Sequence, residues 1–221
     1  MRPIQKTINI AAAVTNGVCT SQTPVNNVAL TLNGSLVSGG VATLPYPGKV
    51  TLASTSDLST VVFAVTGLVL NADGTKTVQT DLIVGPNNST VTSARTFVTV
   101  KAVLPLTATT FTTEKVIVGS ADIGIGNGAW WPLDIYTPNQ VTTISCNILA
   151  SGSATYTVEY TNEDIWDPSI TPLAVAHPAA ALAGATTDQT AFTTTLMRAV
   201  RVNIASGAGQ LRVTLTQQST A

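Results

Sequence analysis

Apolar and polar residues alternate with a period of two along much of this 221-residue chain, which is typical of β-strands with one buried face. Residues 155–160 place Tyr156 and Val158 on one face and hydroxyl or charged side chains on the other. The segments 200–204 and 210–216 repeat this pattern. Each therefore predicts a half-buried strand of an antiparallel sheet.

Turn-forming residues separate the predicted strands. Further strands are expected at 28–32, 40–44, 49–54, 95–104, 115–118 and 141–148. The segment 71–74 predicts a hairpin between strands at 59–70 and 75–85, because its Asp-Gly pair tolerates positive φ. The glycines of 206–209 predict a second tight hairpin between the last two strands.

One long stretch breaks the alternation and suggests a boundary. Residues 119–138 hold three closely spaced glycines, a Trp-Trp pair and two prolines. We therefore expect an all-β fold of two tandem antiparallel domains, β-sandwich or jelly-roll-like, joined by this Gly/Trp/Pro-rich seam. The expected parts are an N-terminal arm at 1–27, a β domain at 28–121 and a second β-sandwich domain at 122–221.

Composition narrows the possible partners. Charged residues make up 10% of the chain and the net charge is −1, so there is no basic surface for nucleic acid. The longest apolar run, 61–70, is too short to cross a membrane. Threonine accounts for roughly one residue in six, and its hydroxyl on the outer face of a strand suits repeated contact with neighbours.

Candidate chemistry is sparse, and we expect no catalytic residue, no bound cofactor and no metal. The single histidine, His177, has no assignable nucleophile or orienting carboxylate, so a structural role is expected. Glu163, Asp164 and Asp167 form an acidic group that predicts a surface loop, with calcium binding as the alternative. Cys19 and Cys146 are expected to be separate thiols, although a disulfide remains open.

Tryptophans and arginines are the candidates for contact with a partner. Trp130, Trp131 and Trp166 are expected to fill the seam between the domains, and a sugar-stacking platform formed by the same three residues is the alternative. The irregular stretch 164–184, which holds Trp166 and His177, predicts an interaction loop. Three arginines near the C-terminal strands suit a partner's carboxylates or simple solvation: Arg198, Arg201 and Arg212.

Several segments resemble a family of tailed-bacteriophage virion structural proteins. The segments that carry the resemblance are 31–44 (TLNGSLVSGGVATL), 61–67 (VVFAVTG), 73–74, 85–87, 97–100, 131–136 (WPLDIY), 151–160 (SGSATYTVEY) and 197–216. The resemblance extends from about residue 10 to residue 218 and concerns strands and turns rather than catalytic motifs. The chain departs from the family at 162–164 and in the longer Ala-rich loop at 179–185.

The resemblance implies a protein located in the virion and assembled in the host cytoplasm. We expect a non-enzymatic capsid decoration protein that binds the major capsid protein or other virion proteins, as a homo-oligomer. A trimer is expected from the threefold positions of capsids. A neck or tail component is the structural alternative, and a glycan-binding adhesin module is the alternative of another class.

Overall fold

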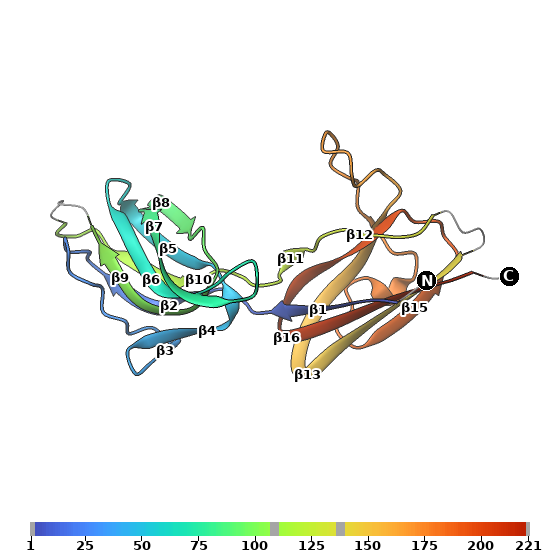
Figure 1. Ribbon diagram of the computed structural model, residues 1–221, viewed down its shortest axis with the longest axis horizontal. Coiled ribbons are helices and arrows are strands. Elements are labelled where there is room, and N and C mark those ends of the chain that lie inside the picture. Colours follow the sequence, from blue (N-terminus) through green and yellow to red (C-terminus); the bar gives the residue numbers. More distant parts are fainter. Residues whose placement is uncertain (1–2, 107–110, 136–139, 220–221) are drawn as a thin grey trace. The chain divides into compact units, whose positions relative to one another are not determined.

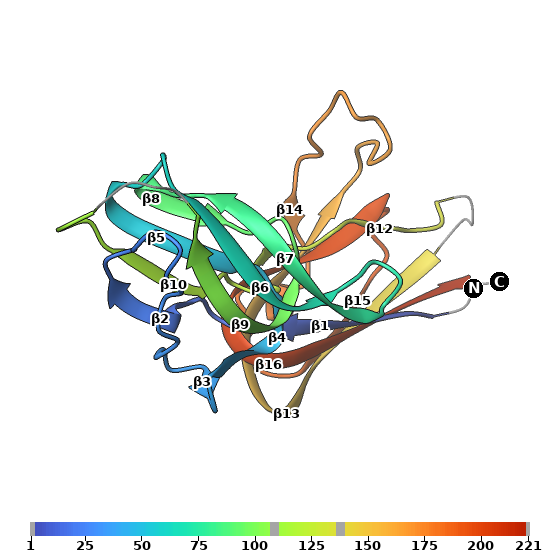
Figure 2. The ribbon, with the colours of Figure 1, turned by 60° about the vertical axis from the view of Figure 1, so that its left-hand side comes forward.

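The computed structural model describes residues 3–106, 111–135 and 140–219 and shows an all-β protein (Figures 1 and 2). Its strands form three antiparallel sheets, and the helical content of the described residues is one 3₁₀ turn, Ala180–Leu182. The predicted all-β class, with antiparallel sandwich-like domains, is confirmed. Tyr136 and Pro138 of the expected seam lie outside the described residues.

The chain forms two compact units, and one of them is discontinuous in sequence. Unit 1 comprises Met1–Ala12 and Gly124–Ala221, and unit 2 comprises Ala13–Ile123. This grouping differs from the expected 1–27, 28–121 and 122–221. The N-terminal residues do not form an arm, because strand β1 (Ile4–Ile10) pairs with a strand of unit 1, and strand β2 (Val14–Gln22) pairs within unit 2.

Unit 2 consists of two antiparallel sheets. The four-stranded sheet has the order β2-β10-β5-β8, with β5 at Val50–Asp57, β8 at Asn87–Thr92 and β10 at Val116–Ser120. The five-stranded sheet has the order β3-β4-β9-β6-β7, with β3 at Val37–Ser38, β4 at Val41–Gly48, β6 at Val62–Leu70, β7 at Lys76–Val84 and β9 at Phe97–Pro105. Alternate residues of the central strands face a common core, as the alternating pattern predicts, for example Phe63, Val65 and Val69 of β6.

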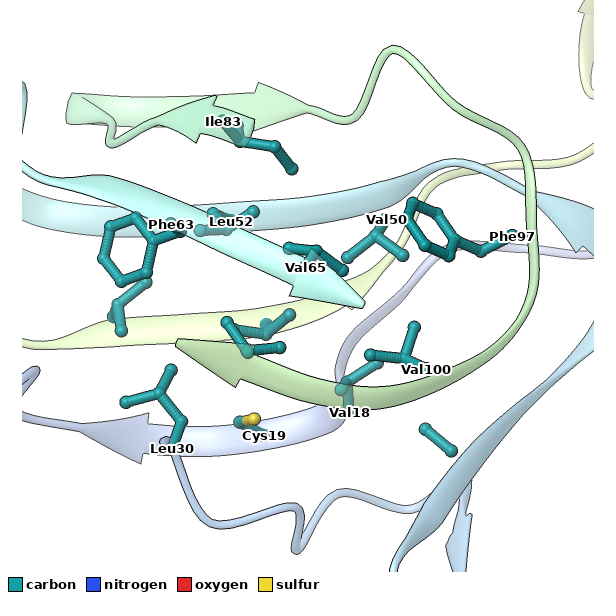
Figure 3. Packing of buried hydrophobic residues seen from close by; sticks show 14 of the residues in the cluster. Val18, Cys19, Leu30, Val50, Leu52, Phe63, Val65, Ile83, Phe97 and Val100 are labelled. Atoms are coloured by element: carbon teal, nitrogen blue, oxygen red, sulfur yellow. The ribbon is translucent and has the colours of Figure 1, made fainter. Parts of the chain in front are cut away.

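The core of unit 2 is built from aromatic and β-branched side chains. Figure 3 shows Phe63, Val65, Phe97 and Val100 of one sheet turned toward Val50 and Leu52 of the other, and all six are fully buried. Burying a side chain of this kind contributes about 1.5–3 kcal/mol, so the alternation itself is the main source of stability.

Local hydrogen bonding and turn residues show where the predicted strands are right and where one is wrong. The 71–74 hairpin is confirmed: it joins β6 to β7, and Gly74 has φ +82°. Residues 28–32, in contrast, form no strand. Their backbone makes isolated bonds instead of a ladder: the Leu30 N–H donates to the Val103 carbonyl of β9 at 2.9 Å, and the Gln22 side chain accepts the Thr31 N–H at 2.9 Å and donates to the Thr31 carbonyl at 2.7 Å.

Unit 1 is organised around two very long paired strands, β13 (Gln140–Thr161) and β16 (Ala199–Ser219). One half of β16 pairs with β1, and the other half pairs with β11 (Gly126–Asn127) and β12 (Trp131–Pro132). The outer edge of β13 carries β15 (Gln189–Thr193) at one end and β14 (Val175–Ala176) at the other.

The two long strands bend together, so that a single sheet supplies both layers around the core of unit 1. Buried residues from both halves belong to one cluster: Ile144, Cys146, Leu211 and Val213 from one half, and Tyr156, Val158, Val200 and Val202 from the other. The ladder is irregular between Leu149 and Ser153. The predicted hairpin at 206–209 is therefore wrong, because these residues continue strand β16 through the bend.

Glycines occupy the bend because the two backbones leave no room for side chains. A Cβ on Gly207 would lie 2.3 Å from the Ser153 carbonyl oxygen, and one on Gly209 would lie 2.7 Å from the Gly152 Cα. Gly207 also has φ +145° and Gly209 φ +103°, which side-chain-bearing residues rarely adopt. A glycine-rich sequence predicts a turn, but here it allows a continuous strand pair to fold over.

We predict that Gly207→Ala lowers the free energy of unfolding of unit 1 by at least about 2 kcal/mol, because backbone atoms must move to admit the methyl group. Gly184→Ala is the matched control in the same unit, since Gly184 has φ +63° but a methyl group there would meet no atom within 4 Å; it should cost only about 1 kcal/mol. All three tryptophans lie in unit 1, so urea denaturation followed by tryptophan fluorescence measures this unit. Equal losses of unfolding free energy in the two variants would show that crowding of the backbones at the bend is not the cause.

Candidate interaction site

A loop of unit 1, here called the presenting loop (residues 162–174), connects β13 to β14 and extends away from the sheet in both views (Figures 1 and 2). Two aspartates shape its backbone. The Asp164 carboxylate accepts the Trp166 N–H at 2.9 Å, and the Asp167 carboxylate accepts the Ser169 N–H at 2.8 Å and its hydroxyl at 2.6 Å. These bonds to Ser169 lower the pKa of Asp167.

The base of the presenting loop is fastened by two further carboxylate contacts. Glu163 accepts the Leu173 N–H at 2.6 Å and so joins the outgoing and returning chain. Arg198, just before β16, forms an ion pair with Asp164 at 3.0 Å. Because both partners are more than a third exposed, this pair contributes at most about 1 kcal/mol. The acidic group predicted from the sequence thus holds the loop in shape.

Large apolar side chains of the presenting loop are left in solvent. Trp166 is 72% exposed and Leu173 is 66% exposed, and Ile170 and the following Val175 are also exposed. Exposed tryptophan flanked by aliphatic side chains is typical of protein contact sites, where a few such residues carry most of the binding energy. Trp166 could be anticipated from the sequence, whereas Leu173 and Ile170 carry no recognisable motif.

The calcium alternative finds no support in the arrangement of the acidic group. Within the described ranges, no three or more His, Cys, Asp or Glu side chains gather closely enough to share a metal ion. Oxygens of Glu163, Asp164 and Asp167 instead accept hydrogen bonds from backbone N–H groups of the loop.

Trp130 and Arg201 belong to a second, flatter cluster on the outer face of unit 1. The Arg201 guanidinium lies 4.5 Å from the centre of the Trp130 ring and donates to Glu159 at 2.7 Å. Asn203 also donates to Glu159, at 3.4 Å. Glu159 and Arg201 are directly opposite in the β13–β16 register, so the ladder itself creates this pair. One face of Trp130 is therefore already covered.

The remaining tryptophan and arginine candidates occupy separate environments. Trp131 is half-buried on β12 and packs against the core of unit 1, where β12 pairs with the start of β16. Arg212 is exposed on β16 opposite Asn147. Trp130 and Trp131 thus pack on strands of unit 1.

His177 is buried at only 3% exposure, directly after β14. Its Nδ1 accepts the Ala179 N–H at 3.1 Å, which places the proton of the neutral ring on Nε2. Nε2 is buried and finds no hydrogen-bond partner in the described part of the chain. Burial lowers the pKa of the His177 imidazole below its ordinary value of 6.5.

Cys19 and Cys146 are free thiols, as expected, and each lies in the core of a different unit. Burial raises the pKa of both thiols to about 12. Because the thiolate is the reactive form, neither cysteine is poised for nucleophilic or redox chemistry.

A second exposed apolar surface lies on unit 2 and was not anticipated. Strand β7 presents Val78, Leu82 and Val84 outward, each more than half exposed. The opposing residues of β6 are Leu68, Ala64 and Val62, of which Leu68 and Val62 are half-buried and Ala64 is buried, so the exposed apolar surface is concentrated on β7. The sequence signal was the run Leu82–Val84 (LIV), which has apolar residues on both faces of the strand end.

No protein-family model, no curated protein and no solved structure matches this chain. Among the described residues, no helix is both long and apolar enough to traverse a bilayer.

We predict that unit 1 loses stability between pH 7.5 and pH 5.5. With the pKa of His177 lowered by folding, the unfolded chain binds more protons than the folded one around and below pH 6.5, so acidification favours unfolding by at most about 1.4 kcal/mol per pH unit. Denaturation followed by tryptophan fluorescence at several pH values measures this slope.

The matched variant is His177→Asn, whose Oδ1 offers an acceptor to the Ala179 N–H without titrating. It should flatten the pH dependence in this window. Four carboxyls also have a lowered pKa, but their contribution to the free energy of unfolding is lost only at more acidic pH: Asp57, Asp73, Glu114 and Asp167. An unchanged slope in the variant would show that another group is responsible.

Proposed function

We propose that this chain is a non-enzymatic structural component of a tailed-phage virion, a capsid decoration protein that binds the assembled head. The observation that carries the proposal is the presenting loop, which directs its carboxylates to its own backbone and its tryptophan to solvent. The carboxylates of the loop, which could otherwise serve catalysis, are therefore engaged in hydrogen bonds, and the tryptophan ring can contact a partner. Because the chain resembles phage virion proteins, we expect the surface that this loop contacts to be that of the capsid.

The buried histidine and cysteines support a binding role over an enzymatic one. The Nδ1 of His177 is occupied by a backbone N–H, and the pKa of each cysteine is raised well above neutrality. A general base or nucleophile needs access to substrate and a pKa near the working pH. All three groups are buried away from substrate, and the pKa of each cysteine lies far above neutral pH.

Binding to the assembled head would stabilise it by mass action. A protein that binds the closed shell but not its dissociated subunits shifts the equilibrium toward the shell by RT ln(1 + [L]/Kd) for each site. A net charge of −1 lets many copies lie close together with little mutual repulsion. Outward hydroxyl pairs such as Ser145–Thr190, 2.9 Å apart, keep the remaining surface hydrated.

Fractionation of purified virions tests the placement. Particles of the phage that encodes the chain are separated into heads and tails, and the chain is quantified in each fraction by mass spectrometry. Recovery with the heads, in many copies per particle, supports a decoration protein. Recovery with the tails, or in a few copies at the junction, would assign it to the neck or tail instead. Absence from the particle would overturn the virion proposal.

We predict that Trp166→Ala weakens binding to heads that lack the protein by about 30-fold, since truncating a central aromatic contact typically costs about 2 kcal/mol. Phe192→Ala is the matched control, because Phe192 is also 72% exposed in unit 1 but lies on β15. Both variants should fold normally, because neither removes a buried side chain. Head binding that is unaffected by Trp166→Ala, measured by co-sedimentation, would exclude the presenting loop as the contact.

A further inference from the structure

Strand β7 forms an open edge of the five-stranded sheet. The sheet order ends at β7, and no strand of the described residues pairs with its outer edge. Its pairing with β6 runs from Lys76 to Val84 without a register shift, so the edge is regular over all nine residues. An uninterrupted edge of this kind offers alternating N–H and C=O groups to another strand.

Strand β7 carries few of the usual protections of an edge strand, and its one inward charge already has a hydrogen-bond partner within the chain. Between Thr77 and Val84 it contains no proline and no lysine, and the only charge is Asp81, which is 9% exposed and accepts the Arg95 N–H at 3.0 Å. Strand β1, at the edge of the sheet of unit 1, shows the contrast, because it carries the exposed Lys6 in its middle and a lysine on an edge strand disfavours pairing. The β7 edge is therefore chemically suited to pairing.

The sequence of β7 is self-complementary about its central residue, Thr80. In an antiparallel pairing of two copies centred there, all nine residues are matched and Thr80 faces Thr80. On the outer face, Val78 of each copy then lies opposite Leu82 of the other, which brings together side chains that are both more than half exposed. Centring the pairing on a neighbouring residue shortens the ladder and breaks this match.

Charges on the inner face are complementary in the same register. Gln79 lies opposite Asp81 of the second copy, and within each copy the Arg95 guanidinium donates to the Gln79 side-chain carbonyl. A guanidinium of one copy is thus brought beside the carboxylate of the other, twice by symmetry. The two Lys76 residues lie at opposite ends of the paired strands and do not repel each other.

We propose that two copies of this chain associate through antiparallel pairing of their β7 strands, about a twofold axis at Thr80, to form one continuous sheet. The interface is isologous, as expected for a symmetric dimer. It replaces the trimer anticipated from capsid geometry. The inference does not depend on the virion proposal, since it rests on unit 2 alone.

Cysteine cross-linking tests the register. Thr80→Cys places two thiols directly opposite each other, about 4.5–5.5 Å apart between Cα atoms, within the range of a disulfide. Under mild oxidation of the purified full chain, we expect a covalent dimer on a non-reducing gel. Thr77→Cys is the control, because the two substituted positions would be about 20 Å apart. The buried native thiols do not compete.

A charge exchange at the same position provides an independent readout. Thr80→Lys and Thr80→Glu should each be monomeric in sedimentation equilibrium, because like charges face each other, and an equimolar mixture should regain the dimer. Thr80 is exposed, so neither variant disturbs the core. A wild-type chain that stays monomeric at all concentrations, equal cross-linking at positions 77 and 80, or a mixture that stays monomeric would overturn the proposal. None of these results would affect head binding through the presenting loop.

Discussion

Unit 1 depends on one constraint, the close passage of β13 over β16 at the bend. Two strands of 22 and 21 residues would otherwise form a long ribbon with both faces in water. Positive φ at Ser151, Gly207 and Gly209 folds this ribbon over, so that Cys146 and Tyr156 of the same strand reach a common core. The sandwich is thus made by bending one ladder rather than by stacking separately formed sheets.

The pairing at the end of β13 explains why the presenting loop can project into solvent. Strand β13 ends at Thr161, and its last residues are held by β16 on one side and β14 on the other. Everything beyond this point can project into solvent without altering the ladder, provided that its backbone polar groups are satisfied locally. Glu163, Asp164 and Asp167 meet that requirement, and the apolar side chains remain available for contact.

The alternation of apolar and polar residues identified most strands, because it marks the side chains that each strand buries in the core. It could not identify partners: nothing local shows that β1 pairs with Leu211–Leu215 at the far end of the chain, or that residues 206–209 continue a strand. Glycine marks positions where a side chain is not tolerated, whether in a turn or at a backbone crossing, and only the tertiary structure distinguishes the two. At residues 28–32 alternation predicted a strand, but the backbone there makes only isolated bonds, to Val103 of β9 and to the Gln22 side chain.

Of the two candidate contact surfaces, the one at Trp166 could be predicted from the sequence and the one on β7 could not. Trp166 was recognisable as a contact candidate because it lies in the irregular stretch 164–184, where an interaction loop was expected, although the tryptophans as a group were expected to fill the seam. The outward apolar face of β7 was not, since a Val or Leu at an outward position has the same alternation whether a neighbour covers it or not. What distinguishes β7 is its position at the end of the sheet order, and sheet order is a property of long-range pairing. In a protein with so few charges, edges and loops with exposed apolar side chains are the surfaces that can discriminate one partner from another, because hydroxyl-covered faces bind water as well as they bind protein.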